Sequence, residues 1–192
     1  MTATSQYPLT RRTFAVRAAA YLSGAGVAGS VFARFAHAQG APSSAGGEIT
    51  HDSEAIHHEV AFRAPRARVY ALLTDEKEFD RVVRLSDAMK VGMPPGAKPT
   101  VISRDAGGTF TTFGGIISGR HIELIPHERL VQAWRPDHWK PGVYSVARFQ
   151  LSDQGTGTKL VFDHTGFPKG EAQSLSDGWH KNYWKPMIKA LG

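Results

Sequence analysis

Hydrophobic and polar residues begin to alternate regularly at residue 55. Positions 56, 58, 60 and 62 alternate with the positions between them, a period of two that predicts a half-buried strand. Residues 39–54 are rich in Gly, Ser, Ala and Pro and show no period, which predicts a flexible leader. We therefore expect one folded domain over residues 55–192.

Two short helices are predicted after this strand. Pro65 suits a first helical turn, where its missing N–H is harmless, and apolar residues at 69, 72 and 73 form a helical stripe. Asp75 is a typical helix cap and precedes a second stripe at 79, 82 and 83.

A run of short strands follows the helices. Strand-like segments occupy residues 101–104, 109–113, 116–125, 130–134, 143–151 and 159–165. The pairs Gly107-Gly108 and Gly114-Gly115 separate such segments and predict tight turns that need positive φ. Gly119 is a candidate β-bulge. The pattern predicts about six antiparallel strands joined as hairpins.

The C-terminal segment predicts one long amphipathic helix. Its large apolar residues recur at four-residue steps, at Leu175, Trp179, Tyr183, Met187 and Leu191. Pro186 is expected to kink this helix or to end its first half. A sheet with one apolar face must be covered, and this helix is the only long element that the pattern predicts. The predicted fold is α+β, a curved antiparallel sheet wrapped around the C-terminal helix, with space for a cavity between them.

Residues 1–38 have the features of a twin-arginine signal peptide. Arg11 and Arg12 precede Phe14, and a mildly apolar segment rich in Ala and Gly follows, too weak for a transmembrane helix. A small-x-small site ends at Ala38, which predicts cleavage before Gln39. We expect transit through the twin-arginine translocase, a periplasmic or secreted mature protein, and no stable membrane anchor in the mature form.

Composition narrows the function classes. The chain has no cysteine, which excludes disulfides, thiol catalysis and Cys-based zinc sites. Residues 1–38 hold four arginines and no acidic residue. Residues 39–192 therefore hold 23 − 4 = 19 basic and 17 acidic side chains, a net charge of +2. Since no localised basic patch is present, nucleic acid is not an expected partner.

Motifs spread over residues 55–191 resemble one family. They are Ala64-Pro65 with Val69-Tyr70, Gly107-Gly108-x-Phe110, Gly114-Gly115, Gly119, Pro126-x-Glu128-Arg129-Leu130-Val131-x-x-Trp134-Arg135, Gly157-Thr158-x-Leu160, His164-x-Gly166, Gly178-Trp179 and Tyr183. Their order and spacing are similar to the activator-of-heat-shock-protein-90-ATPase homologue branch of the SRPBCC (START/birch-allergen-like) superfamily.

The resemblance implies a helix-grip (START-like) fold. Members of the superfamily bind lipids, sterols and other hydrophobic ligands in a cavity, and others cyclise polyketides. The branch takes its name from a eukaryotic co-chaperone. Because one fold hosts several functions, the resemblance does not choose among them.

Seven residues are candidate ligand contacts: Phe110, Arg120, Trp134, Phe149, His164, Trp179 and Tyr183. The five aromatic ones are expected to face the interior, either as core or as cavity wall. His164 shares strand parity with positions 160 and 162, so we expect it inside, as filler or as a polar ligand contact. Arg120 shares parity with positions 122 and 124. Because burial without a partner would be unfavourable, we expect it either to reach solvent or to meet an anionic group, such as a ligand carboxylate, Glu59 or Asp137.

Motifs for nucleotide, cofactor and metal chemistry are missing. The sequence contains no nucleophile elbow, phosphate loop, dinucleotide fingerprint or His-Glu-x-x-His helix. His57 and His58 are adjacent, but neighbours on a strand point to opposite faces and cannot share an ion. We expect no cofactor and no metal.

Three functions remain open. The first is a binding module for a small hydrophobic or amphipathic molecule in a cavity between sheet and helix. The second is a protein-interaction or chaperone-assisting module, which predicts an exposed apolar patch around residues 134–139. The third is a cyclase- or lyase-type enzyme, which requires polar groups such as Ser118, Arg120 or His58 to converge with His164.

Overall fold

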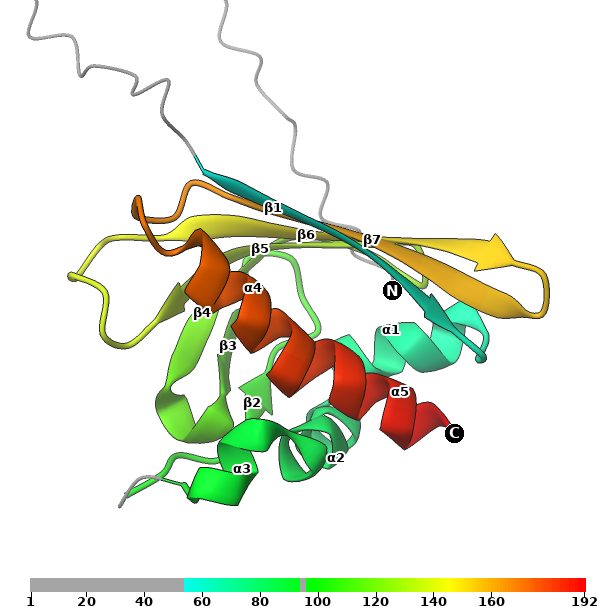
Figure 1. The fold of residues 1–192 in the computed structure, drawn as a ribbon, viewed down its shortest axis with the longest axis horizontal. Helices are drawn as coiled ribbons and strands as arrows, with labels where there is room; N and C mark the ends of the chain where they lie inside the picture. Colours follow the sequence, from blue (N-terminus) through cyan, green and yellow to red (C-terminus); the bar gives the residue numbers. More distant parts are fainter. Residues whose placement is uncertain (1–53, 94–95) are drawn as a thin grey trace, which may run out of the picture. The chain divides into compact units, whose positions relative to one another are not determined.

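The computed structural model describes residues 54–93 and 96–192. In this part of the chain seven strands form one antiparallel sheet in the order β1-β7-β6-β5-β4-β3-β2 (Figure 1). They are β1 (Ala55–Phe62), β2 (Val101–Ile102), β3 (Thr109–Thr112), β4 (Ile117–Ile125), β5 (Arg129–Pro136), β6 (Ser145–Gln154) and β7 (Gly157–Thr165). The predicted signal peptide, its cleavage site and all of the predicted leader except residue 54 lie outside the described residues.

The strands of the sheet centre have one buried face. Along β7 the side chains at 158, 160, 162 and 164 are buried, and those between them are half-buried or exposed. β5 shows the same alternation, and β6 shows it over its first seven residues. This is the period of two that the sequence predicts, and it confirms that His164 faces inward with Leu160 and Phe162.

Three helices connect β1 to β2. They are α1 (Arg66–Thr74), α2 (Glu76–Leu85) and the short α3 (Asp87–Val91). The Asp75 carboxylate accepts hydrogen bonds from the backbone N–H groups of Lys77 and Glu78, at 3.0 and 3.1 Å, and so caps α2 as expected. The pattern of the sequence does not predict α3, because five residues are too few to show a helical period.

The C-terminal helix is continuous but changes its winding in the middle. It consists of α4 (Ala172–Trp179), a π-helical turn (His180–Trp184) and α5 (Lys185–Leu191). The backbone N–H of Lys185 donates to the carbonyl of His180, five residues earlier. This wider turn directly precedes Pro186, so the proline neither breaks nor ends the helix.

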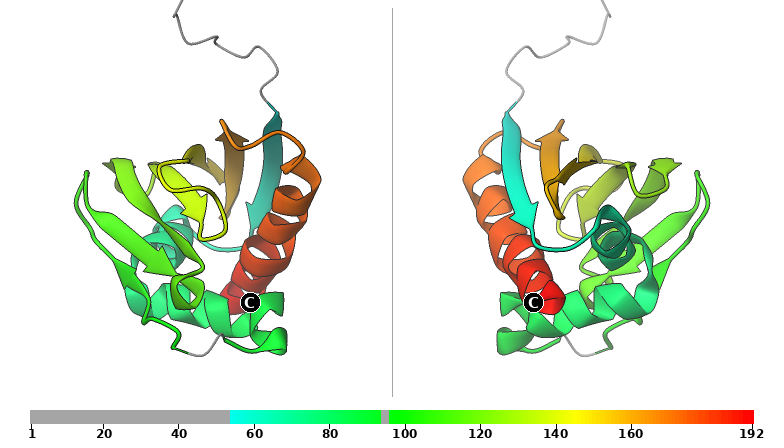
Figure 2. Two further views of the ribbon diagram at one scale, coloured as in Figure 1. Left: turned by 90° about the vertical axis from the view of Figure 1, so that its left-hand side faces the viewer. Right: turned by 90° about the vertical axis from the view of Figure 1, so that its right-hand side faces the viewer.

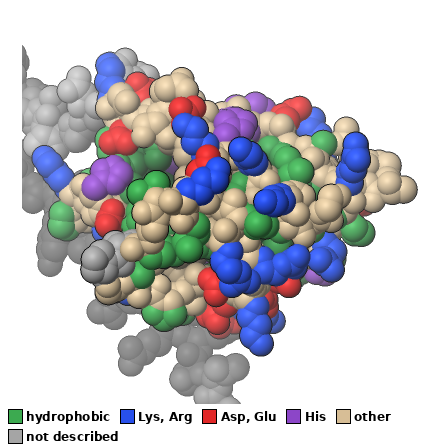
Figure 3. All heavy atoms as spheres, turned by 60° about the horizontal axis from the view of Figure 1, so that its bottom comes forward, with side chains coloured by type: hydrophobic (Ala, Val, Ile, Leu, Met, Phe, Trp, Pro, Cys, Tyr) green, Lys and Arg blue, Asp and Glu red, His purple; other side chains and the backbone are tan. Residues whose placement is uncertain are grey.

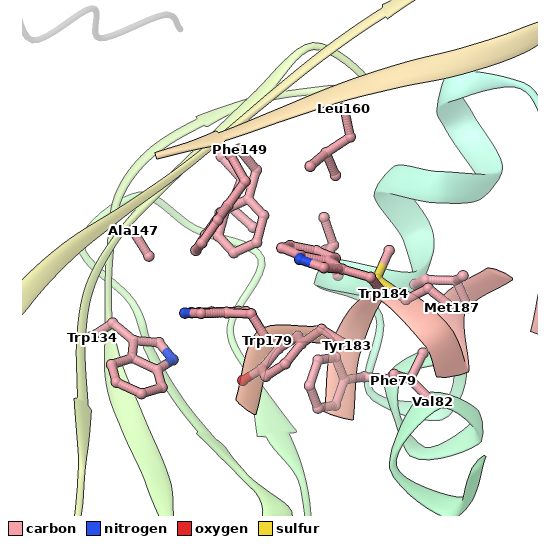
Figure 4. Close-up of a cluster of buried hydrophobic side chains, with 14 of the residues drawn as sticks. Phe79, Val82, Trp134, Ala147, Phe149, Leu160, Trp179, Tyr183, Trp184 and Met187 are labelled. Atoms are coloured by element: carbon pink, nitrogen blue, oxygen red, sulfur yellow. The ribbon is translucent and has the colours of Figure 1, made fainter. Parts of the chain in front are cut away.

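The C-terminal helix lies on the concave side of the curved sheet, with α1 and α2 beside it (Figure 2). The α+β, helix-grip arrangement predicted from the sequence is therefore confirmed. Aromatic rings fill much of the interior between helix and sheet (Figure 4). The centroids of the Trp179 and Phe162 rings lie 4.4 Å apart, and those of Phe149 and Phe162 lie 5.0 Å apart.

The bulge in β4 lies two to three residues later than the sequence suggested. Gly119 pairs regularly with Trp134, and the register shifts between His121 and Glu123 instead. Because a bulge reverses the facing of residues on either side of it, His121 is buried and Arg120 is exposed. Of the two placements left open for Arg120, reaching solvent or meeting an anionic group, the structure has the first, and its guanidinium donates to the backbone carbonyl of Gly107.

Candidate functional site

An open pocket lies beside the first half of the C-terminal helix. Its volume is about 200 Å³, and its walls come from α3, the start of β4, the end of β5 and residues 171–183. The aromatic walls are Phe113, Trp134, Trp179 and Tyr183; the polar side chains are His138, Glu171, Ser174 and Asn182. Apolar patches among charged side chains are visible on the surface turned toward the viewer in Figure 3.

A buried indole lies in the pocket wall beside a buried phenol. Trp134 is 4% exposed, and its Nε1 is buried. Figure 4 shows this nitrogen pointing toward the Tyr183 side chain. Burial raises the pKa of Tyr183 far above its usual value, and interactions with Trp134 and Thr112 oppose that rise only in part. Tyr183 is therefore a neutral phenol at physiological pH.

A helix–helix contact borders the same pocket. The Asn182 side-chain oxygen accepts a hydrogen bond of 2.9 Å from the backbone N–H of Ala88, the second residue of α3. Both residues line the pocket. At the mouth, His138 Nε2 lies 3.9 Å from a carboxylate oxygen of Glu171, and both side chains are partly exposed.

His164 lies in the interior, where both of its ring nitrogens are hydrogen-bonded. Trp179 Nε1 donates to its Nδ1 at 3.0 Å, and its Nε2 lies 2.7 Å from the Ser145 hydroxyl. That hydroxyl donates onward to the Trp134 carbonyl. Burial lowers the pKa of His164 to about 4, so the ring is neutral at physiological pH.

A second pair of the same type lies toward the edge of the sheet. Trp184 Nε1 donates to His58 Nδ1 at 2.8 Å, and His58 Nε2 lies 2.9 Å from the Ser176 hydroxyl. Partial burial lowers the pKa of His58, as do the nearby His180 and His57 rings. Two indoles of the C-terminal helix thus bind two histidines of adjacent strands, which anchors the helix to the sheet.

The structure separates the seven predicted contact residues into groups. Trp134, Trp179 and Tyr183 line the pocket. Phe110 and Phe149 border a separate void of about 10 Å³, about the smallest space that admits one water, so they belong to the packed core. His164 lies behind the pocket walls, and Arg120 is exposed.

The segment 134–139 does not form the exposed apolar patch that the interaction hypothesis predicts. Trp134 and Trp139 are 4% and 5% exposed, and their ring centroids lie 5.8 Å apart. The guanidinium of Arg135 closes this loop by donating to the Trp139 carbonyl. The expectation of an exposed patch here is wrong, because the two indoles pack on each other.

The polar groups required by the enzyme hypothesis do not converge on His164. Its two ring nitrogens bind Trp179 and Ser145, whereas His58 binds Trp184 and Ser176. Within residues 54–93 and 96–192 no cluster of His, Cys, Asp and Glu could hold a metal ion, and no helix is long and apolar enough to cross a membrane.

Several pocket residues were not predicted. No sequence pattern distinguishes Phe113, Glu171 or Asn182. Phe113 and Glu171 stand beside turns, and Asn182 lies on a face of the C-terminal helix that also contacts α3. Gly178 was noted only as part of a motif. A Cβ at its position would meet no atom within 4 Å, so the absent side chain leaves part of the pocket open.

Residues 63–192 match the family described as Activator of Hsp90 ATPase homolog 1-like protein. The chain belongs to this family. The resemblance to this branch of the SRPBCC superfamily, drawn above from sequence motifs, is therefore confirmed.

Curated relatives match the chain over part of its length. The human Activator of 90 kDa heat shock protein ATPase homolog 1 is 27% identical over 94 residues, which are 49% of this chain and 28% of the human protein. The Dictyostelium discoideum homolog is 35% identical over 79 residues, 41% of this chain and 21% of that protein. The chain therefore matches less than a third of the length of either relative.

Solved structures share the fold. An HSP90 activator from Plasmodium falciparum superposes with a TM-score of 0.60 at 23% identity, covering 73% of this chain and 96% of the other. A protein from Chromobacterium violaceum gives 0.54 at 21% identity, covering 71% and 96%. At these identities the likeness shows the fold alone.

Proposed function

We propose that this protein binds a small hydrophobic or amphipathic molecule in the pocket beside α4. The observation that supports this most directly is the pocket itself, which is open, about 200 Å³ in volume and walled by Phe113, Trp134, Trp179 and Tyr183. An apolar cavity of about 150 Å³ is enough to take up benzene. The ligand is therefore of the size of one ring or a short branched chain.

The position of the pocket also supports binding over simple packing. The interior under α5 is filled by large rings and Met187, whereas a Cβ at Gly178 in the pocket wall would meet open space. An apolar wall exposed to water is unfavourable by about 25 cal/mol per Å², and a ligand removes that exposure.

The proposal is tested with the chain as purified, by denaturing it and weighing any released small molecule. We expect a molecule that is present with the native protein and is not covalently bound. The matched variants are Gly178→Leu, whose side chain extends into the pocket, and Gly178→Ala, which leaves most of it open. The molecule should be lost from the first and kept by the second.

A direct titration covers a ligand that is lost during purification. Cumene is added to the wild-type chain, and the fluorescence of the pocket tryptophans or the NMR shifts of their indole protons report binding. Saturable binding that Gly178→Leu abolishes supports the proposal. No released molecule together with no saturable cumene binding would overturn it.

The second candidate function is a protein-interaction module. The observation in its favour is the family match, since curated relatives are named activators of the 90 kDa heat shock protein ATPase. The chain matches 28% of the length of the human relative. The test is to add the purified chain to heat shock protein 90 and to measure ATP hydrolysis. An unchanged rate counts against this candidate.

The proposed place of action is outside the inner membrane. This rests on the twin-arginine pattern of residues 11–14 and the small-x-small site ending at Ala38. Replacing Arg11 and Arg12 by lysines should retain an unprocessed chain in the cytoplasm. N-terminal sequencing of the exported form should begin at Gln39.

A further inference from the structure

We propose that the edge of β1 and the outer face of the C-terminal helix together bind an extended peptide that carries an acidic side chain at every second position. This site is separate from the pocket beside α4, and it does not depend on the small-molecule function. Three observations support it: a groove, an unpaired strand edge and the spacing of a row of lysines.

A groove lies between the second half of β1 and the C-terminal helix. Its volume is about 490 Å³. Val60, Trp184 and Ile188 are among its walls, and Ile188 is 48% exposed. Both views of Figure 2 show β1 and the helix side by side. An extended segment placed along β1 would therefore direct one face of its side chains toward the helix.

The backbone of β1 is paired on one side only. β1 has eight residues and lies at one end of the sheet, and among the described residues it pairs with β7 alone. No other backbone hydrogen bond of the described chain reaches residues 55–62. Alternate residues of such an edge strand direct their N–H and C=O groups away from the sheet, where a further strand can bind them. The β1 edge therefore offers its backbone to a peptide.

The walls of the groove carry an excess of positive charge. Lys181 and Lys185 line it, whereas Glu59 is its one acidic wall residue. The Glu59 carboxylate is already bound to Lys159, at 2.7 Å. An acidic occupant would therefore meet more positive than negative charge.

Two lysines of the outer helix face are available to a partner. In the described part of the chain, no carboxylate oxygen lies within 4.0 Å of the ammonium group of Lys185 or Lys189, and both side chains are exposed. The hydrogen bond from Lys90 lowers the pKa of Asp87, and the charge of Lys185 does so less strongly. Because Asp87 is held by Lys90 at 2.6 Å, it does not neutralise Lys185.

The spacing of the lysines selects an alternating sequence. Lys181, Lys185 and Lys189 follow at four-residue steps, which places them about 6 Å apart along a helix. In an extended peptide every second side chain lies on the same face, at intervals of about 6.6 Å. The helix runs in roughly the same direction as β1 in Figure 1, so a strand added to β1 would follow this row. Acidic residues at every second position therefore match the lysines.

A second copy of this chain fits the same edge less well. Pairing two β1 strands would bring the C-terminal helix beside each of them to one interface. The two lysine rows would then lie close together, and like charges at an interface are unfavourable. The charge therefore favours an acidic peptide over self-association.

The first test compares two labelled peptides of the same composition. One alternates glutamate and threonine over eight residues, and the other has four glutamates followed by four threonines. Each is titrated into the purified chain at low ionic strength, where exposed charges are least screened, and fluorescence anisotropy reports binding. We expect the alternating peptide to bind at least about threefold more tightly, because the blocked one places half of its charge on the opposite face.

The second test removes the unpaired charges from the helix. The double variant Lys185→Gln with Lys189→Gln should weaken binding of the alternating peptide roughly fivefold. Lys77→Gln with Lys140→Gln is the matched control, since both lysines are exposed and lie outside the groove, and it should leave the affinity unchanged. Cumene binding should be unchanged in both double variants, because none of these lysines lines the pocket beside α4.

The third test separates strand addition from charge. Two further alternating peptides are N-methylated, one at every glutamate and the other at every threonine. Only one of these sets directs its N–H groups toward β1, so one peptide should lose binding and the other should keep it. Hydrogen exchange should also slow at the outward-facing amides of residues 59–61 when the unmethylated peptide binds.

Each contrary result overturns the proposal. Absence of saturable peptide binding removes it outright, and equal affinity of the alternating and blocked peptides would leave only non-specific attraction to positive charge. Binding of phosphatidylglycerol vesicles without binding of either peptide would make the lysine row a membrane contact. A dimer in which residues 59–61 are protected from exchange would make a second copy the occupant. Cumene binding, and with it the proposed function, would stand in every one of these cases.

Discussion

The two halves of the interface between the C-terminal helix and the sheet differ in how they are filled. Under the second half, Phe149, Phe162, Trp184 and Met187 are each at most 2% exposed. Beside the first half, an open pocket of about 200 Å³ lies between α4, the start of β4 and the end of β5. One helix and one sheet thus form a packed core at one end and a ligand-sized space at the other.

The difference comes from a few side chains on otherwise similar surfaces. Both halves carry a tryptophan that donates to a histidine of the sheet. Large rings line both halves, but the open half has Gly178 on the helix, where a Cβ would meet no atom within 4 Å. The aromatic stripe is therefore no guide to where the cavity lies.

The largest expected contrast uses one substitution in each half. Leu160→Ala removes side-chain atoms from the closed half, where Leu160 is fully buried, and should cost about 4 kcal/mol of unfolding free energy. Leu175→Ala removes the same atoms from the pocket wall, which already lacks neighbours on one side, and should cost about 2 kcal/mol. Urea denaturation measures both; equal costs would contradict the distinction between the halves.

The pH dependence of stability tests the histidine behind the pocket. The pKa of His164 is about 4 in the folded protein and about 6.5 when unfolded, so the unfolded chain binds more protons between these values. His164 therefore makes stability fall as pH decreases through this range, by about 3 kcal/mol in all. Denaturation curves measured from pH 7 to 4 should show that the wild type loses about this much more unfolding free energy than His164→Gln. The variant is the control, because its carboxylates titrate as they do in the wild type.

The two tryptophan–histidine pairs should differ in strength. Trp179→Phe leaves the Nδ1 of fully buried His164 without a donor. It should lower the free energy of unfolding by about 2 kcal/mol beyond the loss caused by the smaller ring. Trp184→Phe makes the same change beside His58, which is partly exposed, so water can replace the lost donor and the corresponding cost should stay below about 1 kcal/mol. A larger loss for Trp184→Phe in thermal denaturation would refute this ranking.

The smallest effect expected is a gain in stability at the open half. Gly178→Ala should raise the unfolding free energy by about 1 kcal/mol, because alanine has the higher helix propensity and its Cβ meets open space. Gly119→Ala is the contrast, since a Cβ there would lie 2.0 Å from the Ala133 carbonyl oxygen and should destabilise. Chemical denaturation of the two variants gives the signs directly.

Local pattern was sufficient for most of the architecture. The alternation along β7, the cap at Asp75 and the four-residue stripe of the last helix each depend on neighbours in the sequence, and each is present in the structure. The facing of Arg120 was not predictable, because a bulge two residues away reversed it. The winding at Pro186 was also missed, since a proline shows where a helix must adapt but not how.

The sequence by itself thus determined the order of most elements and the covering of a curved sheet by the last helix, because hydrophobic period and turn residues act over short distances. The family followed from the resemblance of its motifs. Only the tertiary structure decided which inward residues became core and which became pocket wall. It sealed His164 between Trp179 and Ser145, and it placed Trp134 and Tyr183 in the wall of a pocket. Those outcomes depend on residues that are distant in the chain meeting at one place, and no periodicity along the sequence records such meetings.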